Sequence, residues 1–302
     1  MLVLISKILN GFKKNRLENL APAHYVDALK KFELAVIRAS TVSYGGVGIL
    51  TSHARETYCS IIFTKLVVTA HSILKLCPNP TNRDFAGSFI DYTAIASLSR
   101  VEVDTFIALF HFGLEDCPEN EYQVRQLLLF WRDHKVRIKM GMYNNSKDGI
   151  EFHNKDLMER LEVNPFWQTI PIKRREHLLK SNAILHSPYD VMERAGFDAD
   201  YNKNLYSYWS AHVHCSSVAF IRMLDEVRGR GAINETDLDL TTVCLEYLVK
   251  ILNFSSDKVD EVLIGSEQRG KSVKSFNPFE LIHESPPWEG RLKMTDLKEF
   301  TN

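Results

Sequence analysis

Four side chains that could take part in chemistry are spaced to share one helical face. Ser97, Arg100, Asp104 and His111 occupy positions i, i+3, i+7 and i+14 of an apolar stretch, and this spacing places them along one side of an α-helix. Arg100 and Asp104 are an i, i+4 pair of opposite charge. Burying such a pair costs free energy unless it is well hydrogen-bonded. The pair is therefore either a structural tie between helices or part of a ligand-binding or catalytic site.

A second group of polar side chains lies about a hundred residues further on. It comprises Tyr206, Ser210, His212 and His214. Ser210 and His214 are four residues apart and adjacent on a helix, so a hydroxyl would lie next to an imidazole, as in activated nucleophiles. No G-x-S-x-G motif surrounds Ser210, which disfavours a serine hydrolase. The pattern favours a histidine hydrogen-bonded inside a helical bundle.

The spacing of possible ligands does not favour a metal or a cofactor. There is no H-E-x-x-H motif and no E-x-x-H motif repeated on two helices, as zinc proteases and di-iron bundles require. A metal would need Asp104, His111, His212 and His214 to converge. The glycine-rich segment 45–48 precedes a helix but lacks a preceding strand and a following Gly-Lys-Ser/Thr. We predict an interhelical turn there, and neither a metal nor a cofactor.

Basic residues cluster in two places, and both could contact RNA. The first set is Arg125, Arg132, Lys135, Arg137 and Lys139, with Trp131 among them, and the second is 173–175. Acidic residues intersperse both sets, which is typical of a solvated helix face. Nucleic-acid contact remains the alternative interpretation.

The elements that position all these residues are predicted to be helices, because helical periodicity dominates the chain. One apolar stripe follows Pro22 and comprises Tyr25, Ala28, Leu29, Phe32, Ala35, Val36 and Ala39. A second helix is predicted over about 52–76. The third, over about 86–114, is apolar on nearly every face, so we expect other helices to surround it. No convincing strand pattern appears.

Capping signals mark the later helices. Asp116 and Glu119 resemble a capping box at the start of a fourth helix. Ser187, Pro188 and Asp190 match an N-cap, N1 and N3, and Gly196 ends that short helix. Two longer helices are predicted over about 201–227 and 236–263.

These patterns predict an all-α fold, a multi-helix bundle with a central buried helix and an irregular C-terminal arm. We divide the chain into N-terminal helices (1–50), the bundle core (51–264) and the proline-rich arm (265–302). Leu2, Ile5, Leu9 and Phe12 share one helical face. That face is interpreted as packing on the body of the protein, with contact to a membrane surface or an oligomer as the alternative.

Composition excludes several classes of protein. The 302 residues carry 37 basic and 38 acidic side chains, a formal charge of −1, so no global field favours nucleic acid or an anionic membrane. No stretch reaches the ~18–20 apolar residues of a transmembrane helix. The five cysteines are scattered, which indicates reduced thiols and a cytoplasmic protein.

With these residues in view, the chain resembles a family of uncharacterised bacterial all-helical proteins, a domain of unknown function. The likeness covers about 55–225 and rests on Leu98-Ser99-Arg100 with a carboxylate four residues on, and on Tyr206, Ser210 and 213–214. Members carry glutamate where this chain has Asp104. Such proteins look like distant relatives of the HEPN ribonucleases and abortive-infection proteins, which implies a role in defence against phage. The HEPN signature of an arginine with a histidine about five residues on is missing here.

The leading interpretation is a helical binding or regulatory protein, a candidate component of antiphage defence with a polar cluster inside its bundle. Its partner would be another protein or a second copy of the chain. The alternative is a degenerate ribonuclease, in which Arg100 holds phosphate, Asp104 is the base and His214 is the acid. An enzyme is neither predicted nor excluded. Under both interpretations Arg100, Asp104 and His214 are expected to meet.

Overall fold

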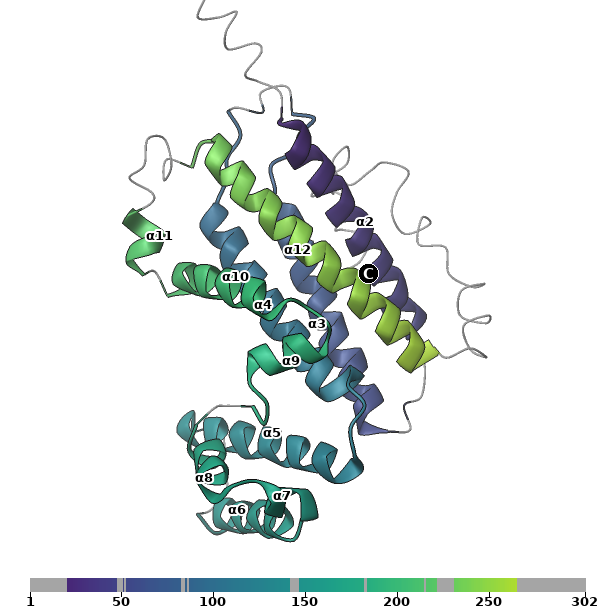
Figure 1. Cartoon of the computed structure of the whole chain (residues 1–302), viewed down its shortest axis with the longest axis vertical. Helices are drawn as coiled ribbons and strands as arrows, with labels where there is room; N and C mark the ends of the chain where they lie inside the picture. The colour runs from purple at the N-terminus through teal and green to yellow at the C-terminus, as the bar shows by residue number, and fades with distance from the viewer. Residues whose placement is uncertain are drawn as a thin grey trace, which may run out of the picture. The chain divides into compact units, whose positions relative to one another are not determined.

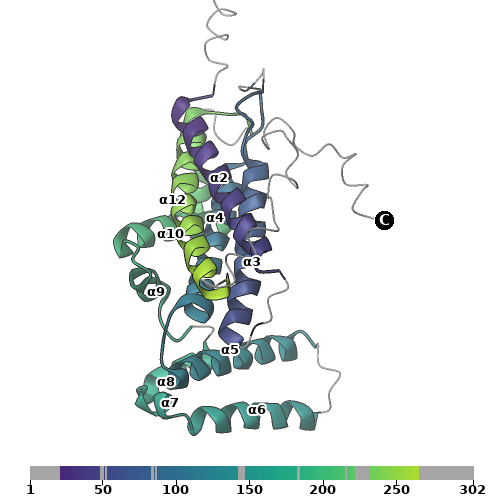
Figure 2. The same cartoon turned by 90° about the vertical axis from the view of Figure 1, so that its right-hand side faces the viewer.

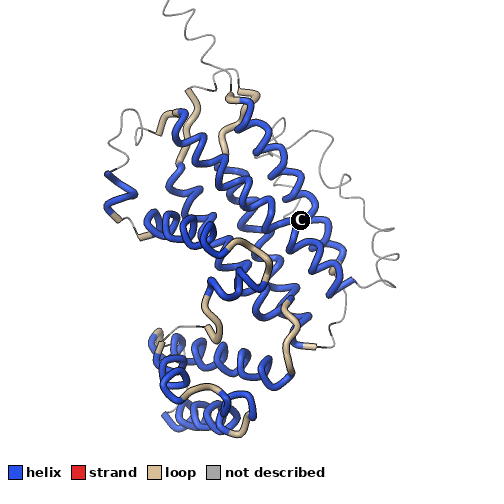
Figure 3. The backbone as a smooth tube through the Cα atoms, viewed as in Figure 1, coloured by secondary structure: helices blue, strands red, loops and turns tan. Residues whose placement is uncertain are grey.

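The computed structural model describes residues 21–47, 51, 53–82, 85, 87–141, 147–181, 184–214, 216–221 and 231–264. Within these ranges the backbone consists of helices and loops (Figure 3), with a single isolated bridge between Phe89 and Ala232. The predicted all-α class is therefore confirmed. The predicted helix at the N-terminus and the arm over 265–302 lie outside the described residues.

The chain forms two compact units. Unit 1 comprises residues 1–106 and 204–302, and unit 2 comprises 107–203. This division cuts across the predicted core of 51–264, because unit 2 is an insertion between two parts of unit 1. The two clusters of polar side chains described below lie one in each unit.

Unit 1 is built on long helices that lie side by side (Figures 1 and 2). They are α2 (Ala23–Gly45), α3 (Ala54–Leu76), α4 (Tyr92–Leu109) and α12 (Glu235–Val259). The same unit also contains α10 (Ala199–Val213), α11 (Ser217–Ile221) and the π-helical turn η3 (Asp260–Ile264). The apolar stripe predicted after Pro22 is buried throughout. Arg38 pairs with Asp257 and His24 with Asp239, 2.7 Å away. His24 precedes Arg38 along α2, and their partners Asp239 and Asp257 follow in the same order along α12. The two helices therefore run parallel.

Among the described helices, α3 is long and apolar enough to cross a membrane. Its residues Phe63, Leu66 and Ile73 are buried in the core of unit 1. A core helix of a water-soluble bundle has the same length and composition, so this helix is weak evidence for a membrane span.

Unit 2 consists of shorter helices around its own apolar core. Its elements are η1 (Phe110–Leu114), α5 (Glu119–Lys139), α6 (Lys147–Glu162), α7 (Pro165–Thr169), α8 (Ile172–Lys180) and α9 (Pro188–Arg194). The core comprises Val124, Leu127, Leu128, Leu157, Leu161, Trp167, Ile170, Leu178 and Leu185. Trp131 Nε1 and Lys135 Nζ donate hydrogen bonds to the Leu179 carbonyl, at 3.1 and 2.9 Å. Both donors thereby satisfy a carbonyl in the last turn of α8.

Local capping was predicted correctly at one helix and wrongly at another. Ser187 caps α9 in a capping box with Asp190, and Gly196 follows the helix at φ +84°. The capping box predicted at Asp116 is wrong, since α5 starts after Pro118 without a side-chain cap. Proline fixes φ near −65° and favours an extended residue at this boundary.

Two predicted long helices are shorter than expected. The helix predicted over 201–227 ends in α10 at Val213, and α11 begins at Ser217. The three residues between them in the sequence are a histidine, a cysteine and a serine, which are weaker helix formers than alanine or leucine. The central helix predicted over 86–114 begins at Tyr92 and becomes π-helical at Phe110. In contrast to the predicted full burial, Val101 and Asp104 on α4 are exposed.

Candidate functional site

Arg100 is the centre of a polar cluster that joins α4 to α10 in unit 1. Its Nε donates a hydrogen bond to Ser210 Oγ, 2.9 Å away, and one Nη donates to the Tyr206 hydroxyl. The other Nη forms an ion pair with Asp104, one turn along α4. All three guanidinium nitrogens are thus engaged by side chains of unit 1.

The partners of Arg100 also contact one another. The Tyr206 hydroxyl donates a hydrogen bond to Asp104 Oδ1 at 3.0 Å. The guanidinium carbon of Arg100 lies 3.4 Å from the centroid of the Tyr206 ring, within the range of a cation–π contact. Arg100 is largely buried, with 17% of its side chain exposed, whereas Asp104 is 49% exposed. The cluster is therefore open to solvent on the Asp104 side.

The expectation that His214 meets Arg100 and Asp104 finds no support in the contacts of its side chain. It is an exposed turn residue just after α10. Its backbone N–H bonds the Ser210 carbonyl at 3.1 Å, but among the described residues no hydrogen bond or ion pair joins its imidazole to the cluster. The Ser210 hydroxyl instead donates to the Tyr206 carbonyl at 2.7 Å.

Of the other candidates of unit 1, His212 packs against aromatic rings. Ser97 is half-buried on α4. His212 is buried on α10, and its ring makes edge contacts with Tyr92 and Tyr208 at centroid distances of 5.2 and 5.1 Å. This arrangement matches a histidine packed inside a bundle.

The most deeply buried carboxyl group of α4 was missed by sequence reasoning. Glu102 is 0% exposed, and neither of its oxygens has a hydrogen-bond partner among the described residues. Burial raises the pKa of Glu102 well above its ordinary value. Burial also raises the pKa of Glu33 on α2 to about 7. A helical projection could have found Glu102, because it shares a face with Ser99 and Phe106 on the buried side of α4.

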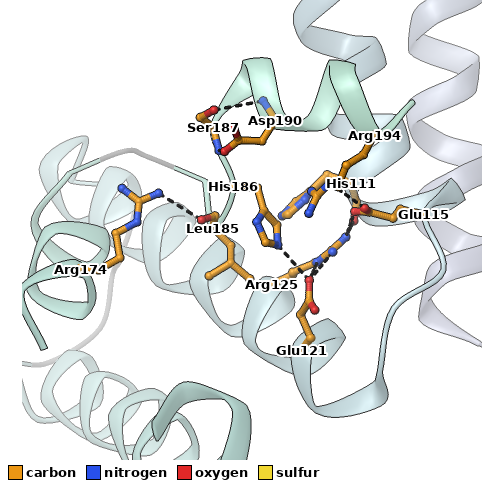
Figure 4. Close-up of polar contacts among 10 residues, drawn as sticks. All are labelled: His111, Glu115, Glu121, Arg125, Arg174, Leu185, His186, Ser187, Asp190 and Arg194. Carbon is orange, nitrogen blue, oxygen red and sulfur yellow. Dashed lines mark hydrogen bonds and ion pairs between the residues drawn. The ribbon is translucent and has the colours of Figure 1, made fainter. Parts of the chain in front are cut away.

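A second polar cluster surrounds Arg125 in unit 2 (Figure 4). Arg125 is 1% exposed, and one Nη donates to the His111 carbonyl at 2.6 Å. The same nitrogen pairs with Glu115 at 2.7 Å, and Nε donates to Glu121 at 3.1 Å. The predicted solvated or RNA-binding role is therefore wrong for Arg125, which is an internal charge of the fold.

Each carboxylate beside Arg125 has a second cationic or imidazole partner (Figure 4). Arg194 Nε lies 2.9 Å from Glu115, and His186 Nε2 lies 3.0 Å from Glu121. Burial opposes ionisation of Glu121, but the hydrogen bonds from Arg125 and His186 outweigh it and lower the pKa of Glu121. Sequence reasoning missed these partners, although Glu121 and Arg125 have the same i, i+4 spacing as Arg100 and Asp104.

His111 belongs to the Arg125 cluster in unit 2, and the pattern that grouped it with Arg100 does not hold. The α-helix that carries Arg100 ends at Leu109, and His111 lies in the π-helical turn η1. A π-helix has more residues per turn, so the i+14 spacing no longer marks one face. The ring of His111 lies 5.7 Å from that of His186, centroid to centroid.

Comparisons with family models, curated proteins and solved structures give no match. Within the described part of the chain, no group of three or more histidine, cysteine, aspartate or glutamate side chains is arranged to hold a metal ion. The described residues thus contain an arginine cluster in unit 1 that is partly exposed to solvent, and a buried network of charged side chains in unit 2.

Proposed function

We propose that the protein is a helical binding or regulatory protein, and that the Arg100 cluster holds α10 against α4 so that unit 1 keeps one conformation. A single observation supports this proposal above the others. Side chains of the protein itself engage all three guanidinium nitrogens of Arg100. These three interactions use three of the five N–H donors of the guanidinium, so fewer donors remain for a substrate phosphate than on an unengaged arginine.

The arrangement around Ser210 and Asp104 supports the same proposal over a ribonuclease. General acid–base catalysis requires an acid and a base within reach of one reacting group. Asp104 would be available as a base, but no hydrogen bond or ion pair among the described residues joins the exposed His214 side chain to the cluster, and the Ser210 proton is directed to a backbone carbonyl. A ribonuclease that uses Arg100, Asp104 and His214 therefore lacks its acid.

Two finer parts of the proposal rest on the sequence. The resemblance to bacterial abortive-infection proteins supports a role as a component of antiphage defence. A cytoplasmic location is supported by Cys59, Cys77, Cys117 and Cys244, which are not joined in disulfide bonds, as is usual in a reducing compartment. The binding partner would be another protein or a second copy of the chain.

The test compares Arg100→Ala with Arg38→Ala in the full chain. Arg38 also links two helices of unit 1, through Asp257, but it is exposed. We expect no RNA cleavage by any of the three proteins. Hydrogen exchange of the α10 amides should accelerate in Arg100→Ala alone, because only that variant loses the links between α4 and α10.

A different result would favour the ribonuclease. The wild-type chain would cleave RNA, and Arg100→Ala would abolish cleavage without changing the melting temperature or the exchange of α10.

Native mass spectrometry of the wild-type chain would test the partner directly, because a retained protein or a second copy changes the mass. The defence role predicts fewer plaques when a bacterial host expresses the wild-type chain, and no protection from Arg100→Ala.

A further inference from the structure

A cavity of about 200 Å³ lies between α5 and α6, two helices of unit 2 that lie side by side (Figure 2). On α5 the lining residues lie three, four and seven positions after the first, so they share one face of the helix. On the other side, the cavity is bordered by the last turn of α6 and the residue that follows it. The lining residues are Gln123, Gln126, Leu127, Phe130, Arg160 and Val163.

The apolar part of this cavity is exposed to water. Leu127 belongs to the core of unit 2 and is 4% exposed. Phe130 and Val163, which complete the apolar lining, are 42% and 79% exposed. Single exposed apolar side chains are common on protein surfaces, but here two of them line one cavity together with a core leucine. An apolar group that fills the cavity would remove these surfaces from water, which is favourable.

The polar part of the cavity offers hydrogen-bond donors to an anion. Of the six lining residues, all of them described, Arg160 alone is charged. Its side chain is 59% exposed, and its ion pair with Asp156 is long, at 3.7 Å, so the guanidinium can bind a second partner. The side-chain amide of Gln126 makes no hydrogen bond to another described residue, whereas Gln123 donates to Glu119 at 3.3 Å.

The volume of the cavity limits what it can hold. About 200 Å³ is below the ~300–1,000 Å³ of sites for drug-sized molecules, and it is therefore too small for a nucleotide. An apolar cavity of about 150 Å³ can hold one benzene ring. A single aromatic ring or a branched aliphatic chain therefore matches the size of this cavity.

We propose that this cavity binds a carboxylate attached to an apolar group the size of one aromatic ring. The ring would pack against Phe130 and Val163. The carboxylate would accept hydrogen bonds from Arg160, with the Gln126 amide as a further donor. A free acid and the C-terminal residue of a peptide both have this chemistry. The site lies in unit 2 and does not depend on the role proposed for the Arg100 cluster in unit 1.

Nuclear magnetic resonance of the full chain tests the site, with 3-phenylpropionate as the first probe. The side-chain amide resonance of Gln126, assigned by its loss in Gln126→Met, should shift saturably. The Kd should be on the order of millimolar, as is usual for so small a ligand. The neutral 3-phenylpropionamide should bind about five-fold more weakly, because it cannot pair with the charge of Arg160.

Two matched pairs of variants assign the contacts. Arg160→Gln should weaken the binding of 3-phenylpropionate about five-fold, and Arg137→Gln should leave it unchanged. Arg137 is 55% exposed and pairs with Asp133 in the same i, i+4 arrangement, but it does not line the cavity. Phe130→Ser should also weaken binding, whereas Val136→Ser, at a 45% exposed position of the same helix outside the cavity, should not.

A tripeptide that ends in phenylalanine with a free carboxylate distinguishes the two sources of the ligand. Binding about ten-fold tighter than that of 3-phenylpropionate identifies the C-terminus of a peptide, because contacts outside the cavity then add affinity. Equal or weaker binding identifies a free acid.

Two results would overturn the proposal. The first is a wild-type chain in which neither the acid nor the peptide shifts the Gln126 resonance saturably, since the cavity would then hold only water. The second is equal affinity of the wild-type chain for 3-phenylpropionate and for its amide, because the carboxylate would then not be recognised.

Discussion

The clusters around Arg100 and Arg125 start from the same local element, an arginine paired with a carboxylate one helical turn away. In unit 1 the carboxylate of that pair, Asp104, is 49% exposed, and in unit 2 the carboxylate, Glu121, is 13% exposed. The exposed fractions of the arginine side chains differ in the same direction, 17% for Arg100 and 1% for Arg125. The i, i+4 spacing is common to both clusters, so it does not determine how much water each pair meets.

The difference lies in what the surrounding segments contribute. Neutral hydroxyl groups from α10 complete the cluster in unit 1. In unit 2, Arg194 and His186 come from distant parts of the sequence and pair with the two carboxylates. Hydroxyl groups can bond to an arginine without adding charge, whereas ionic partners bury further charges that must all be balanced. Unit 1 therefore has a polar link between two helices, and unit 2 has an interdependent network of charges.

The largest expected effect is the loss of stability in Arg125→Met. This substitution leaves Glu115 and Glu121 buried without their shared partner, and breaking a buried ion pair costs about 3–5 kcal/mol. Arg100→Met should cost less, about 1–2 kcal/mol, because Asp104 can be hydrated. Urea unfolding of the full chain measures both values, and Arg38→Met, at an exposed pair, is the control. Equal losses in Arg125→Met and Arg100→Met would contradict the contrast drawn between the clusters.

Thiol reactivity should also differ between the units. Burial raises the pKa values of Cys59 and Cys244 in unit 1 to about 12, whereas Cys117 in unit 2 is only half-buried. The thiolate is the reactive form. In the native protein, alkylation of Cys59 and Cys244 should be at least about 100-fold slower than that of Cys117. Peptide mass spectrometry after timed alkylation resolves each site, and comparable rates would show that the core of unit 1 opens readily.

The sequence alone was enough to predict the helices but not the grouping of their side chains. The stripe from Tyr25 to Ala39 and the cap at Ser187 were predicted correctly. Both depend on neighbours within a few residues in the chain, which periodicity and capping rules describe directly. The break after Val213 and the π-helical turn at Phe110 were not predicted, because both are small local deviations from a regular helix.

Those two deviations account for much of what was missed in the candidate sites. The α-helix ends just before His214, and the π-helical turn ends the register that grouped His111 with Arg100. Arg125 was grouped with exposed basic residues because its partner Glu115 lies outside its own helix, and because His186 and Arg194, which pair with its two carboxylates, come from distant parts of the sequence. Burial of a charge is decided by tertiary packing, which helical spacing does not reveal.

Stability should depend on pH with opposite sign in the two units. Glu102 has a raised pKa in the folded state, so its contribution is fully present below about pH 4.3 and is lost as pH rises towards the folded pKa. Glu121 has a lowered pKa, so its contribution is present above about pH 4.3 and is lost as pH falls through the folded pKa.

Two glutamine variants separate these contributions. Glu102→Gln should remove a slope of up to about 1.4 kcal/mol per pH unit above pH 4.3. Glu121→Gln should instead lose stability at neutral pH and flatten the curve at acidic pH. Urea unfolding at a series of pH values from acidic to neutral measures both curves. If Glu102→Gln leaves the curve above pH 5 unchanged, Glu102 is hydrated or paired in solution.

The smallest effect is expected from Asp104→Asn, which keeps the shape of the side chain and removes its charge. Half of Asp104 is exposed, and exposed ion pairs contribute about 0–1 kcal/mol because water and salt screen them. The free energy of unfolding should therefore fall by less than about 1 kcal/mol. The loss should shrink further in 1 M salt, where the Debye length is about 3 Å. A double-mutant cycle with Arg100→Met isolates the energy of the pair from the hydrogen bonds to Tyr206 and Ser210. A coupling above about 2 kcal/mol that persists in salt would mean that the Arg100 pair is shielded from water as the Arg125 network is, and the distinction between the two units would fail at its most exposed residue.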